Sequence, residues 1–262
     1  MNYESIILRT EERIATIILN RPRQLNAIDD SMAEDLKRAI DEIRENDGIR
    51  VLVLTGSGRA FCAGGDLQSH SSIRASSIGI RLRKVRDTVE LCLKLRSLEK
   101  PVVASVNGLA FGAGCDLACA CDMRIASQNA TFAEAFVKVG LVPDMGGTYF
   151  LPRLVGVAKT CELIFTGDAI DAEEAERIGL VNKVVTCDQL ESATKAIALK
   201  LAAAPIFAMA AAKRAIYRGL EISLATELEN ETVIMSLLHG TRDAQEGIRA
   251  FIEKRRPEFD KA

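Results

Sequence analysis

Two glycine-rich segments contain the residues of this sequence whose types and spacing could do chemistry. They read GRAFCAGGDL (58–67) and NGLAFGAGCDL (107–117), and each follows a short apolar run. Small side chains let a ligand approach backbone N–H groups closely. At the beginning of a helix, such N–H groups have no intrahelical acceptor and lie at the positive end of the helix dipole. The two segments therefore predict a ligand site built from backbone donors, or, as the alternative, two tight strand-to-helix turns.

Better-known site motifs do not fit these segments. Neither has the G-x-G-x-x-G spacing of a dinucleotide-binding turn, and no Walker A loop occurs in the chain. The seven cysteines include no C-x-x-C pair, and the two histidines lie in no nucleophile or metal motif. Cys115 and Cys119 share a helical spacing of four, but free cysteines usually pack as small apolar residues. We expect no metal site and no disulfide framework.

Composition excludes several classes of protein. The chain has 262 residues, of which 48% are hydrophobic and 27% charged, a balance typical of folded domains. A formal net charge of −2 gives no basic field for nucleic acid. No apolar run approaches the ~20 residues of a membrane span, and the first residues show no signal peptide. We therefore expect a soluble cytoplasmic protein that binds neither nucleic acid nor a membrane.

The elements that must position the two segments follow from hydrophobic periodicity. Helices are predicted over 31–46 and 82–98, between apolar runs that predict buried strands at 14–19, 51–54, 102–106 and 123–126. This alternation is typical of an α/β protein with a parallel sheet. The chain after residue 187 has only helical patterns, at 189–203, 206–218, 223–239 and 242–254. We predict an α/β core over 1–187 and a C-terminal helical region over 188–262.

Several segments, in their order along the chain, resemble the crotonase superfamily of enoyl-CoA hydratases and isomerases. The matching segments are LNRPRQLNAI (19–28), AFCAGGDL (60–67), KPVVASVNGLAFGAGCDLACACD (100–122), FAEAFVKVGLVPDMGGTYFLPRLVG (132–156), FTGDAIDAEEAERIGLVNKVV (165–185) and FIEKRRPEF (251–259). The resemblance implies a crotonase fold of repeated ββα units with a C-terminal helical region. It also implies an acyl-CoA thioester as substrate, with coenzyme A as part of that substrate and no other cofactor.

The same resemblance assigns the two backbone donors. By motif position, the N–H groups of Gly65 and Ala113 hold the thioester carbonyl oxygen. This oxygen gains negative charge as an enolate forms, so fixed N–H donors stabilise the transition state more than the ground state. Alanine in place of the commoner glycine at position 113 is compatible with this role, because the donor is backbone.

The carboxylates depart from the hydratase pattern. Asp116 takes the place of the first hydratase glutamate and Phe136 that of the second, while Glu134 lies two positions too early. Asp144, in GLVPDMGG, matches the base of members that resemble epoxyphenylacetyl-CoA isomerases. Without the resemblance, Asp144 would be interpreted as the N-cap of a helix starting near Gly146.

Two enzymatic functions are consistent with these residues. The first is an isomerase that moves the double bond of a 3-enoyl-CoA to the 2-position, with Asp144 as a single base. The alternative is a hydratase of an unsaturated or cyclic acyl-CoA that uses Asp116 and Asp144 as its carboxylate pair. A third interpretation, an RNA-binding family member without activity, disagrees with the net charge and with the retention of both loops.

The resemblance also implies a substrate-binding set and an assembly. The substrate is expected to contact Phe136 and the nucleotide-binding positions Arg23, Ala27, Ala63, Gly64, Asp66, Leu67, Phe251 and Lys254. Lys254 would contact a CoA phosphate, either within its own chain or across a subunit boundary. The expected assembly is a homohexamer of two trimers, with the helical region contributing to subunit contacts and to the CoA pocket. Acyl specificity is expected from residues 68–86 and from the surroundings of Phe136 and Tyr149.

Overall fold

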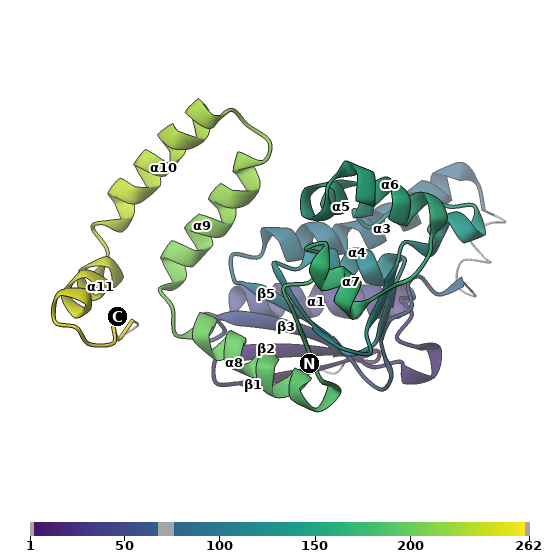
Figure 1. Ribbon diagram of the computed structural model, residues 1–262, viewed down its shortest axis with the longest axis horizontal. Coiled ribbons are helices and arrows are strands. Elements are labelled where there is room, and N and C mark those ends of the chain that lie inside the picture. Colours follow the sequence, from purple (N-terminus) through teal and green to yellow (C-terminus); the bar gives the residue numbers. More distant parts are fainter. Residues whose placement is uncertain (1–2, 68–75, 260–262) are drawn as a thin grey trace.

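Two sheets form the centre of the molecule. A computed structural model describes residues 3–67 and 76–259 of the chain (Figure 1). The larger sheet has the order β1-β2-β3-β5-β7-β10, with β1 (Ile6–Glu11), β2 (Ile14–Leu19), β3 (Val51–Gly56), β5 (Val102–Val106), β7 (Met123–Ser127) and β10 (Lys183–Val185). The strand β1 is antiparallel to β2, and all the later pairs of this sheet are parallel. The four predicted strands are confirmed.

The smaller sheet consists of short strands that follow the strands of the larger sheet. Its order is β4 (Ala60–Cys62), β6 (Leu109–Phe111), β8 (Thr131–Ala133) and β9 (Ile170–Asp171). Thus β3 leads into β4, β5 into β6 and β7 into β8, which confirms the expected ββα units of the crotonase fold. Strands of three residues have too few positions to show an alternating pattern, so periodicity did not predict them.

Helices surround the two sheets. They are α1 (Asp30–Glu45), α3 (Ile78–Ser97), α4 (Ala113–Ala120), α5 (Gly147–Val155), α6 (Val157–Thr166), α7 (Ala172–Arg177) and α8 (Leu190–Ala202). Along β3, Leu52 and Leu54 belong to the main apolar core, whereas Val51 and Val53 pack with the cluster that contains Ala198 of α8. Successive strand residues point to opposite faces, so α8 closes the second face of the sheet.

The last three helices form an arm that leaves the core. They are α9 (Ile206–Gly219), α10 (Leu224–Leu238) and α11 (Arg242–Ile252), and Figure 1 shows them to one side of the sheets. The helical region was predicted to begin at residue 188, but α8 packs on the sheet as part of the core. The arm, defined here as residues 206–259, therefore begins with α9.

Polar contacts join the arm to the core. The Lys213 ammonium of α9 lies 2.8 Å from the Asp122 carboxylate, and the Tyr217 hydroxyl donates to the same carboxylate. Among the described helices, none is by itself long and apolar enough to span a membrane. The segments 187–202 and 206–219 are long and apolar enough only when taken together, and the chain bends by 105° between them.

Candidate active site

The two glycine-rich loops meet backbone to backbone. A Cβ atom on Gly114 would lie 2.1 Å from the Cys62 carbonyl oxygen, and one on Gly64 would lie 2.8 Å from the Phe111 carbonyl oxygen. Such separations leave no space for a side chain. Gly64 also has a φ of +101°, which glycine adopts without strain. Glycine at these positions therefore lets the end of β4 and the beginning of α4 form one continuous surface.

This surface presents the two predicted donors. Ile28 donates its N–H to the Gly64 carbonyl and accepts from the Asp66 N–H, both at 2.8 Å. The N–H of Gly65, between these two residues, takes no part in the pairing. Ala113 is the first residue of α4, so its N–H has no intrahelical acceptor. In the described part of the chain, neither N–H has a protein acceptor. Gly65 and Ala113 both line a single pocket.

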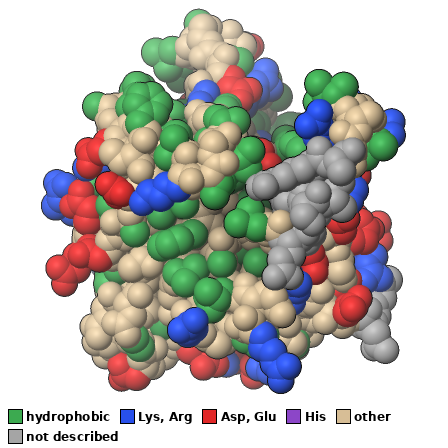
Figure 2. Space-filling view, turned by 90° about the vertical axis from the view of Figure 1, so that its right-hand side faces the viewer, with side chains coloured by type: hydrophobic (Ala, Val, Ile, Leu, Met, Phe, Trp, Pro, Cys, Tyr) green, Lys and Arg blue, Asp and Glu red, His purple; other side chains and the backbone are tan. Residues whose placement is uncertain are grey.

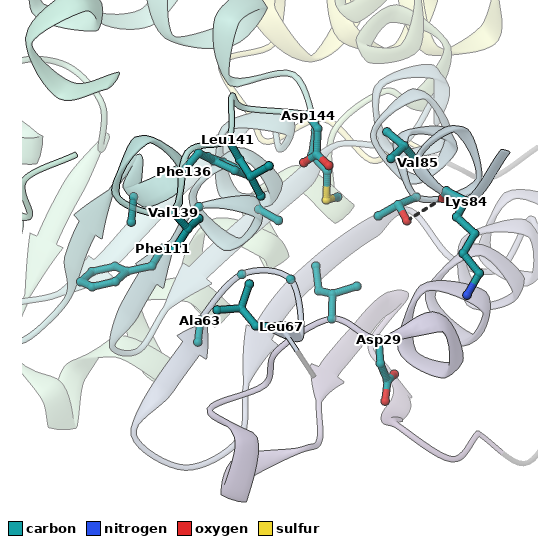
Figure 3. A pocket seen from close by; sticks show the side chains of 18 of the residues that line it. Asp29, Ala63, Leu67, Lys84, Val85, Phe111, Phe136, Val139, Leu141 and Asp144 are labelled. Carbon is teal, nitrogen blue, oxygen red and sulfur yellow. Dashed lines mark hydrogen bonds between the residues drawn. The ribbon is translucent and has the colours of Figure 1, made fainter. Parts of the chain in front are cut away.

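Most of the pocket wall is apolar. Figure 3 shows Leu67, Phe111, Phe136, Val139 and Leu141 around the space in front of the two loops. Apolar side chains also gather in the middle of the face shown in Figure 2, at the end of the molecule opposite the arm, with charged side chains toward the edges. An apolar wall excludes water and strengthens the electrostatic effect of the donors inside it.

Asp144 is the carboxylate that the loop before α5 brings into this pocket. Figure 3 shows its side chain pointing into the space between Leu141 and Val85. Asp144 does not cap a helix, as the alternative interpretation expected. The helix α5 begins at Gly147 with Gly146 as N-cap, and no described side chain makes a capping hydrogen bond to it. Asp29 and Asp30 line the opposite wall, where Asp29 caps α1 and Asp30 pairs with Lys84 at 3.1 Å.

Asp116 is not part of the pocket lining. It is fully buried on α4, and its Oδ2 accepts the N–H of Met145 at 3.2 Å. Burial, and then the neighbouring Glu134, raise the pKa of Asp116 well above its usual range. The prediction made Asp116 a catalytic carboxylate, but its contacts are with the chain behind the wall that carries Asp144.

Glu134 is a candidate functional residue that the family register did not suggest. Its side chain is 1% exposed, and burial raises its pKa to about 8. A signal was present in the sequence. Alternation along β8 turns Phe132 inward, and the next residue with the same orientation is Glu134.

Arg21 is a second residue that the prediction missed. Its guanidinium donates to the Ala27 carbonyl at 2.6 Å and lies 2.9 Å from Asp29 and 3.0 Å from Asp66. It thereby ties the Gly65 loop to the N-terminus of α1. Asp66, predicted to bind substrate, is thus paired with Arg21 and does not line the pocket.

The other predicted substrate-binding residues divide into two groups. Ala63, Gly64, Leu67 and Phe136 line the pocket, and the exposed Arg23 and the buried Ala27 lie at the turn before Ile28. Phe251 and Lys254 do not line the pocket of their own chain, and their contact with CoA across a subunit boundary stays a prediction. Phe251 is on α11 and 85% exposed, and Figure 1 shows α11 separated from the core by α9.

Two further sequence expectations concern specificity and metals. Of the predicted specificity segment 68–86, residues 68–75 lie outside the described residues, and Lys84 and Val85 of α3 line the pocket, as does Thr88 just beyond the segment. Within residues 3–67 and 76–259, no group of three His, Cys, Asp or Glu side chains could hold a metal ion.

Known proteins are similar to this chain in both sequence and structure. The model of the family described as enoyl-CoA hydratase/isomerase matches residues 9–262. Relatives include a crotonyl-CoA hydratase from Syntrophomonas wolfei, 39% identical with 99% of each chain covered, and a 1,2-epoxyphenylacetyl-CoA isomerase from Escherichia coli K12, 37% identical with 98% covered. The enoyl-CoA hydratase structure from Bacillus anthracis is 36% identical, with a TM-score of 0.93 over 98% of this chain and 99% of that one. The chain therefore belongs to the enoyl-CoA hydratase/isomerase family of the crotonase superfamily.

Proposed function

We propose that this enzyme is an acyl-CoA isomerase in which Asp144 is the acid–base residue. The observation that carries the proposal is the shared pocket: Asp144 points into the space that Gly65 and Ala113 also line. The carbonyl oxygen of a thioester accepts from the two N–H groups, which makes the protons at C2 more acidic. Asp144 removes a C2 proton of a 3-enoyl-CoA and returns it at C4, so the double bond moves into conjugation.

The apolar surroundings support this reaction class. Phe136 occupies the family position of the second hydratase glutamate and lines the pocket. A proton transfer between two carbons of one substrate needs no bound water, and a single base within reach of both carbons suffices. The apolar wall also protects the enolate from protons of the solvent.

Hydration of a 2-enoyl-CoA is the second candidate, and the names of the relatives favour it. The relatives from Syntrophomonas wolfei and Clostridium acetobutylicum, both 39% identical, are named as hydratases of crotonyl-CoA and short-chain enoyl-CoA. The position of Asp116 behind the pocket wall argues against the predicted carboxylate pair. In a hydratase of this geometry, Asp144 would have to activate water alone.

Parallel incubation with two substrates tests the proposal. The purified enzyme is mixed with a 3-enoyl-CoA and, separately, with crotonyl-CoA, and the absorbance of the conjugated thioester is followed. Isomerisation increases this absorbance with the first substrate, whereas hydration decreases it with the second. A large decrease with crotonyl-CoA and no change with the 3-enoyl-CoA would replace the isomerase by the hydratase.

We also propose that a neighbouring subunit supplies Phe251 and Lys254 to the CoA site of a hexamer built from two trimers. The exposed apolar side chains of the arm support this assembly, since burial in a subunit contact would stabilise them. Sedimentation of the enzyme at micromolar concentration as a stable monomer would contradict it.

A further inference from the structure

A pair of buried carboxyl groups behind the pocket has no role in the proposed proton transfer. Asp116 is 0% exposed and Glu134 1% exposed, and each carboxyl group is among the neighbours that shift the pKa of the other. Asp116 Oδ1 and both carboxyl oxygens of Glu134 have no donor among the described residues. An ionised carboxylate can only accept hydrogen bonds, so two ionised groups would leave these oxygens unsatisfied. A proton on one carboxyl group can instead be donated to an oxygen of the other.

The side chains that shift the pKa of Asp116 and Glu134 most are other acids and thiols. Cys115 and Cys119 of α4 act on the pKa of Glu134, and Asp144 adds to the effect of Glu134 on Asp116. No lysine, arginine or histidine of the described chain is among the groups that shift either pKa. Burial without a cation disfavours the charged form of an acid.

The pair is connected to Asp144 through the next residue, Met145. The Met145 N–H donates to Asp116 Oδ2 at 3.2 Å, and its carbonyl accepts from the Cys92 thiol at 2.9 Å. A Cβ on Gly147 would lie 2.2 Å from Asp116 Oδ1, so only glycine leaves room for the carboxyl group. The backbone that carries Asp144 is thus held from α3 and from α4.

We propose that Asp116 and Glu134 form a protonated carboxyl pair at neutral pH, which positions the Asp144 loop and keeps negative charge away from the oxyanion donor Ala113. The proposal rests on the proposed role of Asp144. Asp116 is in the first turn of α4, whose N-terminal dipole stabilises the enolate oxygen at Ala113. A negative charge on Asp116 would weaken the positive potential at the N-terminus of α4 and so stabilise the enolate less. The pair is therefore a positioning device that does not touch the substrate.

The pair makes the reaction sensitive to alkaline pH. Because burial raises the pKa of Glu134 to about 8, the pair begins to lose its protons near that pH. Negative charge then develops beneath Ala113, and we expect kcat to decline while KM changes little. Glu134→Gln alone removes an acidic neighbour and gives Asp116 an amide donor. Both changes lower the pKa of Asp116. We therefore expect Asp116 to be negatively charged at neutral pH in the Glu134→Gln variant.

Infrared spectroscopy tests the protonation directly and requires no activity. Ordinary Asp and Glu side chains are ionised at pH 7, so a carbonyl band of a protonated carboxyl group identifies the pair. We expect this band in the wild-type enzyme at pH 7, a decrease of the band as the pH rises through about 8, and its absence from the double variant Asp116→Asn/Glu134→Gln. A wild-type spectrum without the band at pH 7 would overturn the proposal. If the band is present and isomerase activity is not, the proposed function fails while the pair stands.

Kinetics test the consequence for catalysis. The double variant has two uncharged amides at every pH, so its alkaline decline should disappear. Its kcat at pH 7 should exceed that of either single variant by about tenfold, the effect of one charge removed near the enolate. Additive single effects, or an unchanged alkaline decline in the double variant, would contradict the proposal. Glu227→Gln in α10 is the matched control, because this buried glutamate also has an oxygen without a donor.

Circular dichroism shows which variants have folded before the rates are compared. If a single variant does not fold, the wild-type infrared titration and the double variant still decide between the outcomes.

Discussion

The core and the arm of this protein differ in how far their large apolar side chains are buried. In the core, Phe61 and Phe132 are buried beside the strands that carry the loops, whereas Phe207 and Phe251 of the arm are 67% and 85% exposed. The residues buried in α9, α10 and α11 are Ala210, Ala211, Glu227 and Ala250. One chain thus buries the aromatic side chains of the strands that carry the loops, but leaves those of the arm exposed. We therefore expect substitutions in the core to change the properties of each single chain strongly. Substitutions in the arm should act through contacts between chains.

The largest expected effect comes from a pair of glycine substitutions. Gly114→Ala places a methyl group 2.1 Å from the Cys62 carbonyl and separates the two loops. We expect a loss of about 3 kcal/mol in the free energy of unfolding, together with loss of activity. Gly247→Ala in α11 places its methyl 3.4 Å from Phe259 and should stabilise its helix by about 0.5–1 kcal/mol. Thermal unfolding measures both, and equal changes in Tm would remove the distinction between core and arm.

Arg21→Ala should have the next largest effect, because it releases the Gly65 loop from the N-terminus of α1. The variant loses a hydrogen bond to Ala27 and two ion pairs. We expect KM to rise by about tenfold with a smaller change in kcat, as lost substrate binding produces. Arg177→Ala is the control, since Arg177 pairs with Glu174 on an exposed helix. If both variants have the wild-type KM, Arg21 does not organise the loop.

The pH dependence of stability sharpens the same comparison. The folded-state pKa of Glu134 is raised from 4.5 to about 8, so its contribution to stability is present below pH 4.5 and is lost as the pH rises toward 8. The wild-type free energy of unfolding should therefore fall, relative to that of Asp116→Asn/Glu134→Gln, between pH 5 and pH 8. Urea unfolding at several pH values measures this difference, and a constant difference would show that folding does not raise the pKa of Glu134.

Sequence periodicity and motifs predicted different parts of this molecule. The predicted helix over 206–218 coincides with α9 within one residue, because a long periodic segment contains many independent positions. Motif register assigned Gly65, Ala113 and Asp144 to one site, and all three line one pocket. The contacts of Asp116 and Arg21 depend on side chains distant in the sequence. A motif match assigns such residues to a family position, but it does not predict which side chains they contact.

The smallest expected effect is in the arm. If Lys254 binds a CoA phosphate of a neighbouring subunit, Lys254→Ala should raise KM by about threefold with little change in kcat. Lys200→Ala, on the exposed side of α8, is the control. An unchanged KM in Lys254→Ala would leave the nucleotide to other residues and would weaken the proposed role of the arm.

The central claim is that Asp144 transfers the proton in a pocket whose donors are Gly65 and Ala113. Its most direct test is the kcat of Asp144→Asn with a 3-enoyl-CoA, measured beside Asp30→Asn, which changes a carboxylate in the opposite wall. Asparagine is nearly isosteric with aspartate, so the fold and CoA affinity should remain. We expect kcat to fall by at least about 100-fold in Asp144→Asn, the low end of general-base contributions, and only slightly in Asp30→Asn. A near-normal isomerisation rate in Asp144→Asn would contradict the claim.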